Sequence, residues 1–112
     1  MNKINMILLG ALLSLNAWAD LSIADFEKNS KPQSVNAYIL GLSSGLNAAN
    51  TALAANNQPP LYCFPPYLNL TLHNIREIIS AGTKEYSDGL VKPSVDEILL
   101  KKLSTLYPCG YD

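Results

Sequence analysis

The fold is decided by residues 30–57, which read SKPQSVNAYILGLSSGLNAANTALAANN. Ser30, Pro32 and Gln33 have the pattern of a helix start, since a serine can cap, a proline fits the first turn and a glutamine can complete a capping box. Apolar residues then recur at alternating steps of four and three, namely Val35, Ile39, Leu42, Leu46, Ala49 and Leu53. This spacing predicts one face of a long amphipathic helix that ends near Asn56.

Two further helix starts flank this segment, one before it and one after a proline-rich connection. Ser22 can cap a short helical turn in which Asp25 is the third residue and Phe26 faces inward. Thr71 can cap another helix, and Gly82 is expected to end that helix or to let it fray. Its inward face is predicted to consist of Leu72, Ile75, Ile78 and Ile79.

The last helix is predicted to begin at Ser94, directly after the stop signal at Pro93. Ser94 and Glu97 have the spacing of a capping box, and Asp96 adds a second acid at the positive helix end. The buried face is expected to consist of Val95, Ile98, Leu99, Leu103 and Leu106. Because no segment shows the alternating pattern of a strand, the sequence predicts an all-α fold, a compact bundle of about four helices.

The first 19 residues have the three parts of a cleavable export signal. Lys3 supplies the positive charge, residues 4–15 an apolar stretch, and Ala17-Trp18-Ala19 a small-residue cleavage site. The apolar stretch is shorter than the about 20 residues of a membrane-spanning helix, so an uncleaved anchor is the less favoured alternative. We therefore expect residues 1–19 to be removed and residues 20–112 to form a single soluble domain in an oxidising compartment, the bacterial periplasm.

Cys63 and Cys109 are the only cysteines of the chain, and both follow the export signal. An even cysteine count in an exported chain indicates one structural disulfide rather than reactive thiols. A bond between residues 46 positions apart is expected to stabilise the domain by about 4 kcal/mol in the chain-entropy description. That is a large share of the roughly 5 to 15 kcal/mol typical of a whole domain.

The charges and the candidate catalytic residues exclude several classes of function. Without Lys3 the chain has seven basic and nine acidic side chains, so nothing favours binding to nucleic acid or to an anionic membrane. His73 is the only histidine, and we expect it to form a solvated surface pair with Glu77 rather than an acid–base pair. Asp96 and Glu97 fit helix capping better than paired catalytic carboxylates. No enzyme activity, metal or cofactor is therefore expected.

Gly41, Ser44 and Gly45 place small residues on one side of the long helix. A glycine inside a helix costs about 1 kcal/mol relative to alanine, so two of them suggest a packing requirement. A tight helix crossing within the chain is the favoured interpretation. A homodimer contact between two copies of this helix is the alternative.

Three segments resemble the Rap/Tai family of type VI secretion immunity proteins. They are Tyr38-Ile39-Leu40-Gly41, Tyr62-Cys63-Phe64-Pro65 and the stretch from Leu103 to Tyr107-Pro108-Cys109, all behind an export signal. Members of that family are small helical periplasmic proteins, often homodimeric. They bind and block peptidoglycan-cleaving amidase effectors that neighbouring cells deliver. The resemblance therefore implies a cognate amidase as partner and protection from self or sibling intoxication as function.

The resemblance also implies that a protruding loop enters the catalytic groove of the amidase. In this chain the polar segment 83–93, between the last two helices, is the expected loop. Its tip is expected to consist of Tyr86, Ser87, Asp88 and Gly89, because they combine an aromatic anchor with polar groups and a tight turn. These four residues and Lys92 are the candidate partner contacts.

Two other functions remain open from the sequence. Small periplasmic chaperones of acid stress share the export signal, the short helical chain and the single disulfide. They depend on carboxylates whose protonation loosens the fold, whereas here seven basic side chains offset the nine acidic ones. The other alternative is immunity to a toxin that is not an amidase.

Overall fold

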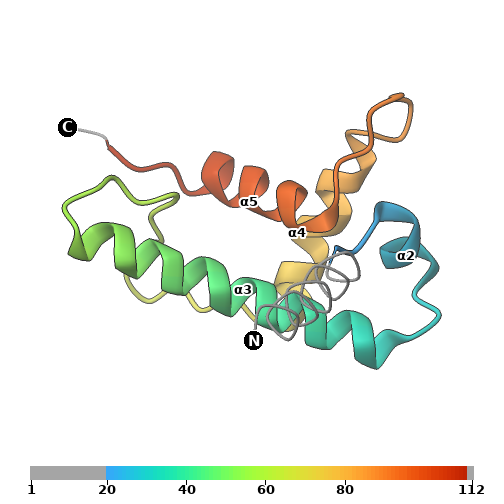
Figure 1. The fold of residues 1–112 in the computed structure, drawn as a ribbon, viewed down its shortest axis with the longest axis horizontal. Helices are drawn as coiled ribbons and strands as arrows, with labels where there is room; N and C mark the ends of the chain where they lie inside the picture. Colours follow the sequence, from blue (N-terminus) through green and yellow to red (C-terminus); the bar gives the residue numbers. More distant parts are fainter. Residues whose placement is uncertain (1–19, 111–112) are drawn as a thin grey trace, which may run out of the picture.

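The computed structural model describes residues 20–110, and this part of the chain is built from helices without any strand. Figure 1 shows a short helix, a long helix and a packed pair of shorter helices, with bounds α2 (Ile23–Lys28), α3 (Pro32–Ala55), α4 (Leu72–Lys84) and α5 (Val95–Leu106). The predicted all-α fold is confirmed. The expected export signal, residues 1–19, lies outside the described residues. Within residues 20–110 no helix has the length and apolar character needed to cross a membrane.

Two helix starts form as their local sequence predicts. The Ser22 side chain accepts a hydrogen bond of 3.1 Å from the backbone N–H of Asp25, so α2 begins where expected. Thr71 caps α4 in a full capping box with Asn74, in which each side chain bonds the backbone N–H of the other residue. Both caps satisfy backbone donors that would otherwise lack partners at a helix start.

The other two predicted caps are wrong. Helix α3 begins at Pro32 with Lys31 in the cap position and no side-chain cap, so Ser30 does not cap it. Ser94 does hold the cap position of α5, but its hydroxyl donates to the Asp96 carboxylate instead of accepting from the helix backbone. The proline at the start of α3 has no N–H to satisfy, which reduces the need for a cap there.

The core combines residues from all four helices with one residue from the connection between α3 and α4. Only Val35 and Ile39 of the predicted α3 face are buried; Leu42 and Leu46 are half-buried, and Ala49 is exposed. The predicted face is thus correct for the first half of α3 and fades along the second half. The wholly buried side chains, in order of size, are Tyr62, Ile39, Ile79, Ile98, Leu99 and Val95.

Gly82 does not end α4, which corrects the expectation from its sequence. The helix continues to Lys84, and Gly82 is buried inside it where α4 crosses α5. A Cβ atom at this position would overlap Cγ2 of Ile98 and lie 3.1 Å from Cγ of Lys102. Glycine is therefore required here by the closeness of the two helices.

Within residues 20–110, the tight crossing expected at Gly41 and Gly45 is not found. A Cβ atom added at either glycine would meet no heavy atom of this part of the chain within 4 Å. Ser44 is exposed together with both glycines. The close packing that these small residues suggested belongs instead to Gly82, and a homodimer contact through α3 remains a prediction.

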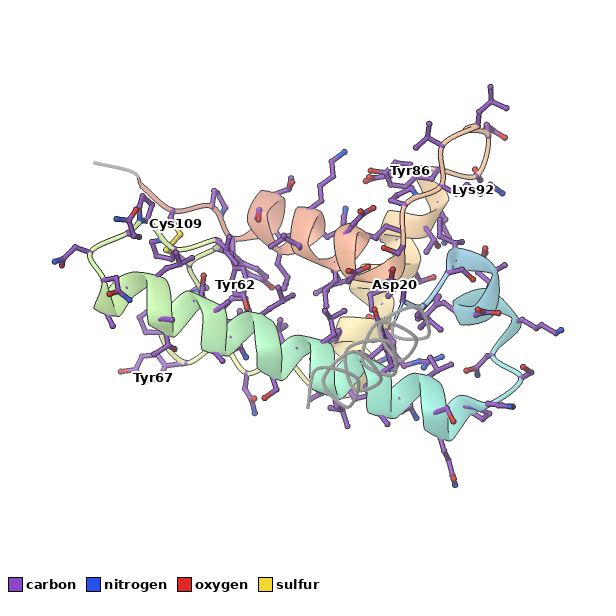
Figure 2. All side chains as sticks on the ribbon, viewed as in Figure 1. Asp20, Tyr62, Tyr67, Tyr86, Lys92 and Cys109 are labelled. Carbon is purple, nitrogen blue, oxygen red and sulfur yellow. A yellow bond between two sulfur atoms is a disulfide. The ribbon has the colours of Figure 1, made fainter. Side chains whose placement is uncertain are left out.

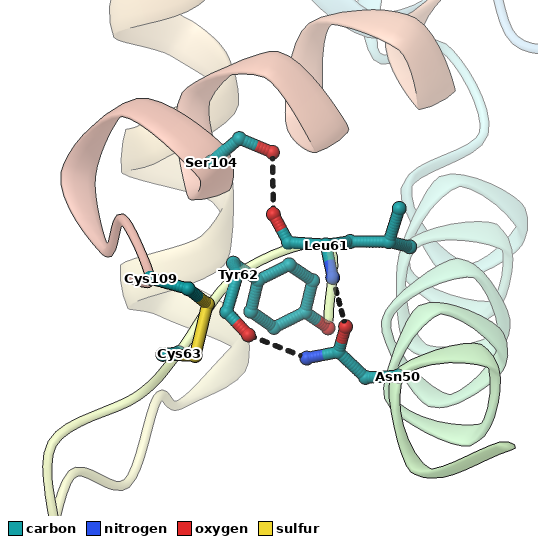
Figure 3. Close-up of a disulfide and its surroundings, with 6 residues drawn as sticks. All are labelled: Asn50, Leu61, Tyr62, Cys63, Ser104 and Cys109. Carbon is teal, nitrogen blue, oxygen red and sulfur yellow. Dashed lines mark hydrogen bonds between the residues drawn. A yellow bond between two sulfur atoms is a disulfide. The ribbon is translucent and has the colours of Figure 1, made fainter. Parts of the chain in front are cut away.

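The connection between α3 and α4 is held from both sides (Figure 3). The Asn50 side chain of α3 donates to the carbonyl of Tyr62 at 2.7 Å and accepts from the N–H of Leu61 at 2.6 Å. On the other side, Ser104 of α5 donates to the carbonyl of Leu61 at 3.1 Å. These bonds give an irregular segment the backbone partners that a strand would find in a sheet.

The disulfide joins the middle of this connection to the end of the chain. Cys63 and Cys109 are bonded as predicted, with their Cα atoms 5.1 Å apart. The N–H of Cys63 also donates to the carbonyl of Tyr107 at 2.8 Å. The covalent bond and the hydrogen bond together tie the end of the chain to the segment that precedes α4.

Replacing Asn50 with alanine is expected to lower the free energy of unfolding by about 1 to 2 kcal/mol. The substitution leaves the carbonyl of the buried Tyr62 without its partner, and an unsatisfied buried polar group is costly. It also removes the acceptor of the Leu61 N–H, but Leu61 is exposed and its N–H can bond water instead. Thr51→Ala is the matched control, since the exposed Thr51 hydroxyl bonds only the Asn47 carbonyl of its own helix. Urea unfolding followed by circular dichroism measures both; equal losses would contradict the bridging role of Asn50.

Candidate functional site

The segment between α4 and α5 is a loop that projects beyond the helices (Figures 1 and 2). Its first part continues the helix as turns, because the N–H of Tyr86 bonds the carbonyl of Thr83 at 3.1 Å and the N–H of Gly89 bonds that of Tyr86 at 3.3 Å. The Ser87 hydroxyl donates back to the carbonyl of Lys84 at 3.0 Å. The turn predicted around Ser87 is therefore present, and it directs the following residues away from the body of the protein.

Tyr86 lies at the base of this loop and not at its tip, which differs from the sequence expectation. Its ring is half-buried and rests against α5. The Lys101 ammonium donates to the Tyr86 hydroxyl at 3.1 Å and lies 5.6 Å from the ring centroid. This hydrogen bond raises the pKa of Lys101 above its usual value. These two contacts connect the start of the loop to α5.

The tip consists of residues 88–92, all of which are exposed. Leu90 is fully exposed, and Val91 keeps 78% of its surface accessible. Asp88 and Lys92 stand on either side of this apolar pair, and neither forms an ion pair with any residue between 20 and 110. The tip thus presents two uncovered apolar side chains between two opposite charges.

Sequence reasoning missed Leu90 and Val91, although a signal was present. They are the only apolar residues between Tyr86 and Pro93, and they follow directly on the Ser87-Asp88-Gly89 turn. Neither residue extends the buried face of α4 or α5. Pro93 separates these two residues from α5, and the turn before them separates them from α4, so the sequence places both apolar side chains in a turn-rich loop.

Both ends of the loop are anchored in the core. Before it, Thr83 is buried, and its hydroxyl donates to the carbonyl of Ser80 at 2.8 Å. After it, Val95 is wholly buried, and its N–H donates to the carbonyl of Leu21 at 2.8 Å. Within residues 20–110, the side chains of Leu90 and Val91 are therefore left largely uncovered, on a loop whose two ends are held in the core.

The remaining candidate residues show no catalytic arrangement within residues 20–110. His73 and Glu77 form the predicted surface pair, with 2.8 Å between Nε2 and Oε1 and both side chains largely exposed. The two cysteines are consumed by the disulfide. The described part of the chain also holds no cluster of three or more histidine, cysteine, aspartate or glutamate side chains that could bind a metal ion.

Three other tyrosines, Tyr62, Tyr38 and Tyr67, are respectively buried, half-buried and exposed. The Tyr62 hydroxyl donates to the Asn47 side chain at 2.6 Å, and burial raises the pKa of the Tyr62 phenol. Burial also raises the pKa of Tyr38, and the negative charge of Asp96 adds to that rise. Tyr67, in contrast, is fully exposed at a left-handed backbone position with φ 73°. Figure 2 places Tyr67 far from the loop that carries Lys92.

Comparisons with known proteins identify no relative of this chain: no protein-family profile, no curated protein and no solved structure matches it.

Proposed function

We propose that this protein is a periplasmic immunity protein that binds and inhibits a type VI secretion peptidoglycan amidase through the loop between α4 and α5. The observation that carries the proposal is the shape of this loop. It projects from the molecule, its two ends are anchored by Thr83 and Val95, and its tip is exposed. A loop of this kind can enter a concave surface on a partner.

The anchored base favours binding over other uses of the loop. Ordering a flexible segment on association costs free energy, so a loop that is already held binds with less loss. Two interactions lie at this base. One is the hydrogen bond from Lys101 to Tyr86, and the other is the ion pair between Glu85 and Lys102, at 3.3 Å. Both interactions connect the base of the loop to α5.

The choice of an amidase as partner rests on the resemblance to the Rap/Tai family. An active-site groove is a concave surface that a projecting loop can block. The disulfide between Cys63 and Cys109 supports an oxidising compartment such as the periplasm, where peptidoglycan amidases act.

A protection assay tests this function. The full chain is produced in a bacterial host together with a type VI cysteine–histidine amidase that is directed to the periplasm, and lysis is followed by the loss of turbidity. We expect cells with the protein to survive and cells without it to lyse. The control is residues 20–112 produced without the export signal, which should stay in the cytoplasm and give no protection.

Failure against a panel of such amidases would reject the amidase assignment. Protection against a periplasmic toxin with another target would keep immunity as the function and replace the partner. Acid-activated suppression of client aggregation, with no protection against any toxin, would instead favour the chaperone alternative.

A further inference from the structure

The tip of the loop has a chemical character that the sequence expectation did not include. Leu90 is fully exposed, Val91 is nearly so, and no other part of the described chain covers either side chain. Leaving apolar side chains in water is unfavourable, and burying them in a partner recovers that free energy. Since both side chains stand free, a partner can enclose them from several sides.

We propose that Leu90 and Val91 are the anchor of the loop and that they dock into an apolar pocket of a partner protein. The rim of this pocket carries a basic group that faces Asp88 and an acidic group that faces Lys92. The proposal rests on the proposed function and names the surface chemistry that the same loop recognises. Tyr86 is then a positioning residue, because Lys101 holds it against α5.

The surroundings of the tip favour a protein pocket over a lipid surface. Of the lysines at this loop, Lys102 pairs with Glu85 at 3.3 Å, and Lys92 lies four residues after Asp88, so acidic groups offset part of the positive charge that could attract anionic lipid. Two apolar side chains also bury little area compared with a membrane-binding helix. A pocket in a protein can enclose an apolar anchor centrally while matching charges at its rim, which is the usual arrangement of a binding hot spot.

Photo-crosslinking in living cells tests where the partner sits. A benzophenone amino acid replaces Leu90 in the full chain, and a second form carries it at Tyr67, which is equally exposed but far from the loop. We expect a protein adduct from position 90 and none from position 67. An amidase adduct supports both the anchor and the proposed function, whereas an adduct with another protein keeps the anchor and rejects the amidase.

The affinity for the crosslinked protein, once purified, tests the chemistry of the anchor. Leu90→Ser combined with Val91→Ser should weaken binding at least about tenfold, since two apolar side chains lose their burial. Tyr67→Ser should leave the affinity unchanged, and circular dichroism should show all variants folded. The absence of a protein adduct at position 90, binding to phosphatidylethanolamine and phosphatidylglycerol vesicles through the tip, or equal affinities for wild type and the double variant would each overturn the proposal.

Discussion

The double variant Cys63→Ser, Cys109→Ser is expected to lose about 4 kcal/mol of unfolding free energy relative to the oxidised protein. The disulfide joins residues that are 46 positions apart, and opening a ring of this size returns much conformational freedom to the unfolded chain. The loss is comparable to the whole stability of a marginal domain of this size. The variant should therefore be partly unfolded at growth temperature.

The loss is expected to arise mainly in the unfolded state, because noncovalent bonds hold the same region of the folded protein. The backbone N–H of residue 63, which donates to the carbonyl of Tyr107 at 2.8 Å in the wild type, is kept in the variant, and so are the bonds of Asn50 and Ser104 to Leu61. Helix positions should thus change little while the variant remains folded. Since Cys63 is exposed, a mild reductant should reach the disulfide in the folded protein.

Urea unfolding of the double variant, of the oxidised protein and of the reduced protein measures this effect. Reduced wild type should match the double variant, which shows that the bond and not the serines causes the loss. A loss below about 1 kcal/mol would contradict the ring-closure argument. The affinity for the partner should change less than the free energy of unfolding, because Leu90 and Val91 are exposed and no described residue, the cysteines included, covers them.

Local signals predicted the helices well because the groups that decide them lie within a few residues. Ser22 and Thr71 cap their helices as expected, since each side chain bonds an N–H three residues further on. Ser94 shows the limit of such signals. Its hydroxyl donates to the nearby Asp96 carboxylate, because a charged acceptor competes well with the helix backbone for the serine side chain.

The features that shape the candidate site depend on contacts distant in sequence, and these were not predictable from one chain. Tyr86 is an aromatic residue in a polar loop, which is typical of a partner contact. Lys101, which lies 15 positions further on, instead bonds it at the side of α5. The exposure of Leu90 likewise follows from where α4 and α5 end and how they cross. The position of the loop was therefore predictable from its turn signals, and Leu90 and Val91 could have been noticed within it, whereas the place of Tyr86 at the base of the loop could not.

The role of each helical glycine also depends on contacts distant in sequence. Replacing these glycines with alanine should therefore change the free energy of unfolding in opposite directions. All three glycines considered lie inside helices, where alanine is favoured by about 1 kcal/mol on intrinsic propensity. Only Gly82 faces another element closely, since a Cβ there would overlap the side chain of the almost wholly buried Ile98. Gly41 and Gly45 face open space within the described chain.

Gly82→Ala is expected to lower the free energy of unfolding by about 2 to 3 kcal/mol, despite the gain in helix propensity. Ile98 is β-branched and enclosed in the core, so its methyl group cannot turn aside without moving the backbone. The two helices must therefore separate, and the loop that joins them must shift with them. Gly41→Ala and Gly45→Ala are the matched controls and should each raise stability by up to about 1 kcal/mol.

Thermal unfolding of the three single variants shows whether each substitution raises or lowers the stability. Stabilisation by Gly82→Ala would mean that α4 and α5 do not cross as closely as the structure has them. Destabilisation by Gly41→Ala or Gly45→Ala, together with a change in mass in solution, would indicate that a second copy packs on α3. Because the α4–α5 crossing sets the direction in which the loop projects, Gly82→Ala should also weaken partner binding, whereas Gly41→Ala should not unless the bound form is a dimer.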